Sequence, residues 1–172
     1  MKNEFDFWGW FFRGRDGRRC GFLRVFDEWT PVHIILGFLI SKIVPLSIYD
    51  SASGMLLPLS GALIGLTFAW AGNANALLQT EELDAVTEQS KGSFQRYVFT
   101  YQAAILVVLG AIVIWAIASL QVFEATWPGQ NSNAYFVIKV ALFSYTSLTV
   151  RECWHVVLGT HLMLIAKNKI KK

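Results

Sequence analysis

The chain has 172 residues, of which 54% are hydrophobic and 16% charged, whereas soluble domains carry roughly 45–50% and about 25%. This skew excludes an intrinsically disordered chain and disfavours a soluble globular domain. The formal net charge is +3, and in a membrane protein the position of the charges matters more than their sum.

Two long stretches, 51–80 and 97–123, carry no charged residue. Each is longer than the about 20 apolar residues that cross a bilayer core of about 30 Å. We therefore expect an all-α integral membrane protein, organised as a four-helix transmembrane bundle. The expected regions are an interfacial N-terminal segment over 1–30, the bundle over 31–166, and a basic tail over 167–172.

The segment 1–30 mixes aromatic rings with basic side chains. This mixture suits the headgroup layer, where rings reach the acyl boundary and arginines meet lipid phosphates. The alternative is a partly ordered tail that packs on the cytoplasmic end of the bundle. Because the apolar run begins only near residue 31, we expect no signal peptide. The residues concerned are Phe5, Phe7, Trp8, Trp10, Phe11, Phe12, Arg13, Arg15, Arg18 and Arg19.

The first span is expected over 31–49. Thr30 is an acceptable N-cap, and Pro31 suits the first helical position. Pro45 should kink the outer end of this helix. The predicted first span thus contains Lys42, is kinked at Pro45 and leads to a short outer loop at 50–53.

The second and third spans are expected over 54–78 and 97–123. Gly61, Gly65 and Ala69 recur at four-residue spacing in the second span. Small residues at this spacing let another helix approach closely in a membrane. The pattern predicts a helix-packing face and, with it, a homo-oligomer.

The fourth apolar region runs over 134–166, and as one helix it would extend about 50 Å at 1.5 Å per residue. This length exceeds the thickness of a bilayer core. Either the helix tilts strongly, or the span covers 134–155 and the chain continues to residue 166 as an amphipathic helix at the cytoplasmic surface. The sequence leaves both alternatives open.

The basic residues outside the spans predict the orientation. The N-terminal segment holds six Lys and Arg, the loop after the second span holds Lys91 and Arg96, and the tail holds four. The expected outer loops, 50–53 and 124–133, hold none. Positive charge accumulates on the cytoplasmic side, so we expect a multi-pass protein of the cell inner membrane with both termini in the cytoplasm.

Two lysines fall inside the expected spans, where a charge is costly. Lys139 lies near the outer end of the fourth span and is expected to snorkel to the surface. Lys42 would lie roughly 16 Å deep in a span over 31–49. It is expected to face a water-filled pathway or to have an internal hydrogen-bonding partner.

A polar stripe follows the fourth span, since Ser144, Ser147, Arg151 and His155 are spaced 3, 4 and 4 residues apart. Glu152 lies about 100° around the helix, so we expect it not to pair with Arg151. Depth counting predicts one polar belt near the inner leaflet, which either conducts or only holds the helices together. Its members are His33, Asn73, Asn75, Gln102, Arg151, Glu152 and His155.

The leading functional hypothesis is a subunit of a homo-oligomeric membrane channel or pore. Four short-looped helices do not enclose a pathway alone, but several copies can, with polar rings lining the axis. Lys42 and Arg151 in such a lining would favour anions. The belt residues Lys42, Asn73, Asn75, Ser144, Ser147, Arg151, Glu152 and His155 are the candidate site residues.

Two alternatives remain. The first is a membrane scaffold or sensor that recruits a cytoplasmic protein, for example in a defence module, through its basic N-terminus, lysine tail and the acidic loop residues Glu81, Glu82, Asp84 and Glu88. The second is a lipid- or quinone-directed enzyme with Glu152 and His155 as acid and base. This enzyme alternative lacks a recognised motif.

We expect no metal or cofactor, no disulfide between Cys20 and Cys153, and no direct binding of nucleic acid.

Overall fold

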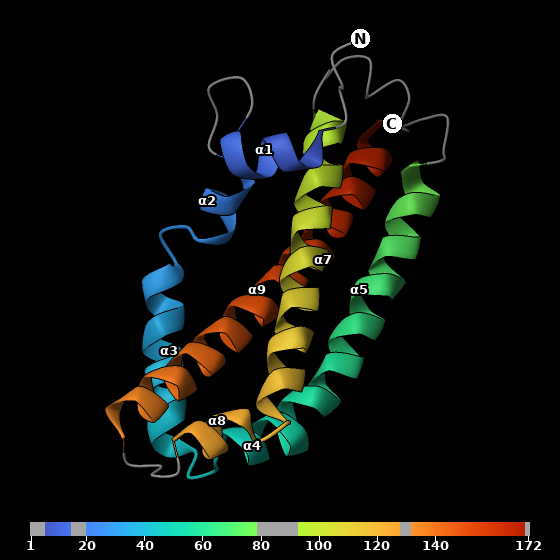
Figure 1. Ribbon diagram of the computed structural model, residues 1–172. Helices are drawn as coiled ribbons and strands as arrows, with labels where there is room; N and C mark the ends of the chain where they lie inside the picture. Colours follow the sequence, from blue (N-terminus) through green and yellow to red (C-terminus); the bar gives the residue numbers. More distant parts are fainter. Residues whose placement is uncertain (1–5, 15–19, 79–92, 128–131, 171–172) are drawn as a thin grey trace. The chain divides into compact units, whose positions relative to one another are not determined.

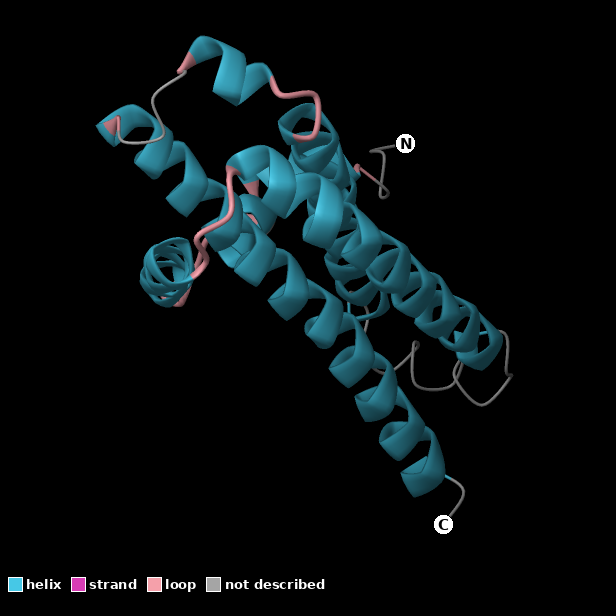
Figure 2. Cartoon of the chain, turned by 90° about the horizontal axis from the view of Figure 1, so that it is seen from below, coloured by secondary structure: helices cyan, strands magenta, loops and turns pink. Residues whose placement is uncertain are grey.

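Every described element of the computed structural model is a helix (Figure 2), which confirms the expected all-α class for the residues described. The helices are α1 Phe7–Arg13, α2 Gly21–Val25, α3 Thr30–Ile43, α4 Ile48–Ser51, η1 Ala52–Leu56, α5 Leu57–Leu78, α7 Ser93–Ala118, α8 Val122–Thr126 and α9 Asn133–Ile170. The structure describes residues 6–14, 20–78, 93–127 and 132–170, with the backbone alone at 70–71, 73–78, 93–97, 162–164 and 166–170.

The chain divides into two compact units, and three of its helices contribute to both. We call Met1–Asp27, Leu66–Ile105 and Cys153–Lys172 the first unit, and Glu28–Gly65 with Leu106–Glu152 the second unit. The contacts described below are those within each unit.

Two described stretches are long and apolar enough to cross a bilayer. They are Ile48–Ala69, with 22 residues, and Val98–Ala118, with 21. They correspond to the second and third expected spans. Helix α3 has 14 residues, fewer than the about 20 that a perpendicular crossing needs.

Helix α3 begins at Thr30 with Trp29 as its N-cap, so Thr30 is not the cap that the sequence predicted, although Pro31 lies in the first turn. The helix ends at Ile43, just before the expected kink at Pro45, and the expected span over 31–49 is not one helix. A residue that precedes a proline is pushed out of the helical region by the proline ring, and Val44, just before Pro45, is extended with φ −86° and ψ 107°. The connection consequently lies at 44–47, and the expected outer loop at 50–53 is helical.

The next helix continues from Ile48 to Leu78 through a π-helical turn, η1. Here the N–H of Leu57 donates to the carbonyl of Ala52, five residues back. Pro58 follows directly and has no N–H to donate to Gly54, while its ring would collide with that carbonyl in an α-helix. The wider turn removes this collision, so we attribute η1 to Pro58.

Helix α7 ends at Ala118, five residues before the expected boundary. Gln121 then adopts a left-handed conformation with φ 59°, which no residue inside an α-helix does. This turn starts the short helix α8. In Figure 1, α8 and α4 lie side by side within the second unit.

Helix α9 is one continuous element of 38 residues. At 1.5 Å per residue it extends about 57 Å, well beyond the thickness of a bilayer core. The helix continues past residue 155 to Ile170, as both alternatives for this region predicted. The structure shows no break near Val150.

Helices α3 and α9 approach each other closely at Gly37 in the second unit. A Cβ atom on Gly37 would lie 2.6 Å from the backbone nitrogen of Ser144 and 2.7 Å from the carbonyl oxygen of Val140. The absence of a side chain therefore permits this contact. By contrast, a Cβ on Gly61 or Gly65 would meet none of the described atoms within 4 Å.

The first prediction concerns Gly37. Replacing it with Leu should lower the free energy of unfolding by about 1–3 kcal/mol, because the new side chain must push α9 away. The measurement is thermal unfolding in a detergent that holds single chains.

The control is Gly61→Leu, which adds the same side chain where space is open and should leave the unfolding midpoint unchanged. An unchanged midpoint for Gly37→Leu would contradict the close helix approach.

Candidate functional site

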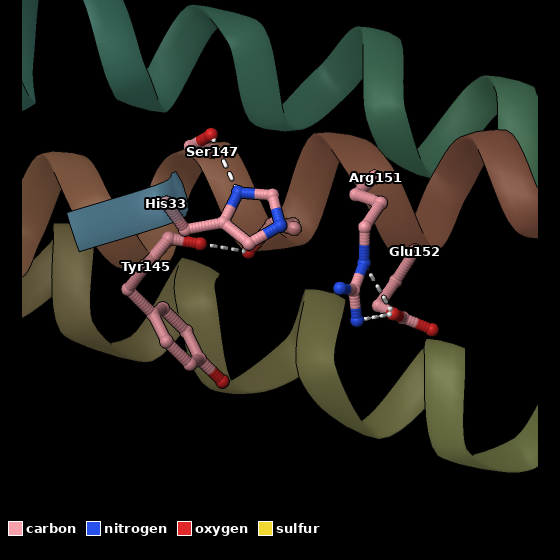
Figure 3. A network of polar contacts seen from close by, with 6 residues as sticks. His33, Tyr145, Ser147, Arg151 and Glu152 are labelled. Carbon is pink, nitrogen blue, oxygen red and sulfur yellow. Dashed lines mark hydrogen bonds and ion pairs between the residues drawn. The ribbon is translucent and has the colours of Figure 1, made fainter. Parts of the chain in front are cut away.

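Four of the expected site residues, Ser144, Ser147, Arg151 and Glu152, lie on one stretch of α9 in the second unit. Figure 3 shows three of them, Ser147, Arg151 and Glu152, with His33 of α3 beside Ser147. His33 is buried, and its Nδ1 lies 2.8 Å from the Oγ of Ser147. This is an interhelical hydrogen bond whose donor depends on the imidazole tautomer. The sequence grouped His33 with the belt but did not predict Ser147 as its partner.

The hydroxyl groups on this stretch of α9 have different hydrogen-bond partners. Ser144 donates to the carbonyl of Val140 at 2.7 Å, and Thr149 donates to that of Tyr145 at 2.8 Å. Such bonds back to the preceding turn satisfy a hydroxyl within its own helix. Ser147 instead reaches across to α3, so it is the serine of the stripe that links two helices.

Arg151 and Glu152 form an ion pair, and the expectation that they do not pair is wrong. The Nε and Nη2 atoms of Arg151 donate to Oε1 of Glu152 at 3.2 and 2.8 Å. The two side chains are only 14% and 5% exposed. Neighbouring positions point about 100° apart at Cβ, but the long arginine side chain bends around the helix to the carboxylate, as Figure 3 shows.

Lys42 lies in the last turn of α3, because this helix ends at Ile43, and a positive charge there is favourable to the helix dipole. Its side chain is exposed, and Nζ lies 5.8 Å from the ring centre of Phe38 and 4.9 Å from that of Phe136. These are cation–π distances. They are not the internal hydrogen bond that the sequence offered as one option, and the water-filled pathway stays a prediction.

Lys139 is buried at 8% exposure, so the expectation that it snorkels to the surface is wrong. Its Nζ donates to the carbonyl oxygen of Val44 at 2.7 Å. That carbonyl belongs to the residue after α3, where the helical hydrogen-bond ladder ends. Because the helix breaks before Pro45, the carbonyl oxygen of Val44 is available to accept a hydrogen bond from the buried ammonium group of Lys139.

The remaining expected site residues are not brought to this face by the described contacts. The side chains of Asn73 and Asn75 lie outside the described residues, as does the acidic loop with Glu81. His155 is half-buried on α9 in the first unit. Gly61, Gly65 and Ala69 are exposed, and their role as a helix-packing face stays a prediction.

A second polar cluster surrounds the start of α4, and the sequence did not predict it. The backbone N–H of Tyr49 donates to Oε1 of Glu124 at 2.8 Å, and that of Ile48 donates to the hydroxyl of Tyr135 at 2.7 Å. Tyr135 in turn donates to Oε1 of Glu124 at 3.1 Å. The one usable signal was Glu124 itself, an acidic residue in an expected outer loop without basic residues.

The chemistry available to the two clusters is that of hydrogen bonding and charge compensation. The Ser147–His33 pair can share a proton, and Arg151 and Glu152 neutralise each other. Among the described residues, no group of three or more His, Cys, Asp or Glu could hold a metal ion. Cys20 and Cys153 are both free thiols.

Comparison with known proteins found no matching family model, no similar curated protein and no similar solved structure.

The second prediction concerns the Arg151–Glu152 pair. Glu152→Ala should destabilise the protein by about 3–5 kcal/mol, because it leaves a largely buried guanidinium without its carboxylate. The double variant Arg151→Leu with Glu152→Leu should recover most of this loss, since neither charge remains buried. Thermal unfolding of the three proteins in detergent measures both steps, and a Glu152→Ala protein as stable as the wild type would contradict the pairing.

The third prediction concerns Glu124. Glu124→Ala should cost about 0.5–2 kcal/mol, the usual effect of removing a helix cap. Glu124→Gln is the matched control, because its amide oxygen still accepts from the N–H of Tyr49. If both variants lose the same stability, the loss comes from the charge of Glu124 and not from its role as an acceptor.

Proposed function

We propose that the protein is a multi-pass membrane protein that forms a homo-oligomeric channel or pore. In this proposal four helical stretches cross the bilayer, and both termini lie in the cytoplasm, as the distribution of basic residues favours. The two long apolar stretches Ile48–Ala69 and Val98–Ala118 support the membrane location.

The proposed assembly rests on the uncovered glycines of the helix Ile48–Leu78. A Cβ added to Gly54, Gly61 or Gly65 would meet no atom of the described part of the chain within 4 Å. Small residues on an uncovered face let the backbone of a second helix approach, and they favour association in a bilayer. A second copy of the chain is the partner that this face suits in the proposal.

The pairing of the belt charges changes the expected selectivity. Glu152 compensates Arg151 within the same chain, so the proposed pathway gains no anion preference from Arg151. The exposed ammonium of Lys42 lies in the last turn of α3, beside the rings of Phe38 and Phe136. The proposal therefore retains the pore and its assembly and drops the preference for anions.

A membrane scaffold or sensor is the second candidate. It is favoured by the bonds that Arg151, Lys139 and His33 form within their own chain. A protein whose intramembrane polar groups bond internally does not need a water-filled pathway to accommodate them. Conduction separates the two candidates, because a scaffold assembles without passing ions.

The fourth prediction tests assembly and conduction together. Wild-type protein in detergent should have the mass of an oligomer by light scattering, and it should conduct ions after reconstitution in a planar bilayer. The double variant Gly61→Leu with Gly65→Leu should reduce both the mass and the current, because the leucines hold the neighbouring helix away.

The control is Val113→Leu, which enlarges an exposed side chain on another helix and should change neither quantity. A wild-type monomer would contradict the assembly. An oligomer without current under any voltage would leave the scaffold as the better account.

A further inference from the structure

Helix α1 carries two aromatic ridges with different surroundings. Phe7 and Phe11 form the inner ridge, with ring centres 5.6 Å apart, and Phe11 is only 7% exposed. Trp8 and Phe12 form the outer ridge, with stacked rings 5.9 Å apart. These outer rings are 56% and 62% exposed, although Trp and Phe bury more apolar area than other side chains.

The inner side of this segment is anchored to one place on α7 within the first unit. The ring centres of Phe7 and Trp10 lie 5.9 and 5.4 Å from that of Phe99. Arg24 of α2 donates from Nη1 to the Oγ1 of the next residue, Thr100. Figure 1 shows α1 lying across the N-terminal part of α7.

The two short helices are also packed on each other. A Cβ on Gly21 of α2 would come within 2.9 Å of ring atoms of Trp10, so glycine is required for this contact. Phe11 and Phe22 make an edge-to-face contact at 6.2 Å. Helices α1 and α2, which we call the platform, therefore pack together as one ordered segment that carries the outer ridge.

The contacts with Phe99 and Thr100 determine how deep the platform lies in the proposed bilayer. Phe99 and Thr100 are the second and third residues of the apolar stretch Val98–Ala118. If this stretch crosses a bilayer, its first turn lies at the boundary between the acyl chains and the headgroups.

The charge of the segment matches an acidic surface. Residues 1–27 contain six Lys and Arg against four Asp and Glu. Arg13 is exposed and directly follows Phe12. Basic side chains beside exposed aromatic rings favour a membrane interface that contains acidic phospholipids.

We propose that α1 and α2 form a membrane-docking platform for the same bilayer that the chain crosses, with Trp8 and Phe12 inserted among the acyl chains just below the phosphates. Phe22 and Leu23 of α2, both exposed, extend the apolar surface. This inference rests on the membrane crossing in the proposed function, but it requires neither an oligomer nor an open pathway. It assigns the outer ridge to lipid and not to a cytoplasmic protein.

The test measures the depth of the outer ridge in the full chain. Phe12→Cys is made together with Cys20→Ser and Cys153→Ser, labelled with bimane, and reconstituted in vesicles of phosphatidylcholine with and without phosphatidylglycerol. We expect a nitroxide near the headgroup to quench the label at least about twofold more than one deep in the acyl chain, because interfacial residues insert only about 5–10 Å. Phosphatidylglycerol should increase this shallow quenching, and aqueous iodide should quench poorly. Trp8→Cys, at the other exposed ring, should behave alike.

The matched control is Val113→Cys, an exposed position well inside Val98–Ala118, where the deep nitroxide should quench more than the shallow one. If Val113 responds to the deep nitroxide while Phe12 and Trp8 respond only to iodide, the docking inference is wrong and the membrane crossing stands. Shielding of these two labels from both iodide and lipid quenchers would also overturn it, in favour of a protein contact. If Val113 is not quenched by lipid, the membrane crossing and the inference fail together.

Discussion

The start of the helix Ile48–Leu78 depends on acceptors that other segments bring to its free backbone N–H groups. The first N–H groups of any helix lack partners within the helix. Here Tyr135 accepts from Ile48, Glu124 accepts from Tyr49, and Ser47 accepts from Asp50. Glu124 belongs to α8 and Tyr135 to α9, so one set of bonds joins three segments of the second unit. The left-handed residue Gln121 allows this arrangement, because it ends the extension of α7 and starts α8.

The same constraint, that a buried polar group needs a partner, explains the other polar contacts of the second unit. Lys139 bonds the carbonyl of Val44, at the place where Pro45 has ended the helix. Ser147 bonds His33, and Arg151 bonds Glu152. In the proposed membrane setting water is not available to replace these partners. The consequence for the proposed function is that Lys139, His33, Ser147, Arg151 and Glu152 have partners within one chain, so a conducting pathway would have to arise between copies.

The exposed aromatic surface of α1, in the first unit, results from the packing of rings and not from the pairing of buried polar groups. Its short helices gain their order from aromatic packing on Phe99 and not from length, since helices of seven and five residues are too short to be stable alone. The rings on one side of α1 provide that packing, which leaves Trp8 and Phe12 outward. An exposed pair of aromatic rings beside basic residues has a natural environment at a lipid interface. The proposed pore and the proposed docking platform thus use separate surfaces of the chain.

Composition, periodicity and proline geometry act within a few residues, so the sequence alone predicted the helical class, the two long apolar stretches and a helix that begins next to Pro31. It also indicated that the helix over 134–166 exceeds a bilayer core. The end of α3 at Ile43, the pairing of Arg151 with Glu152 and the contact of Lys139 with Val44 came only from the folded chain. There, Gly37 permits a close helix contact, while a Cβ on Gly61 would meet no described atom within 4 Å. These outcomes depend on how helices distant in sequence are rotated and how closely they approach, which the spacing of residues along one helix does not specify.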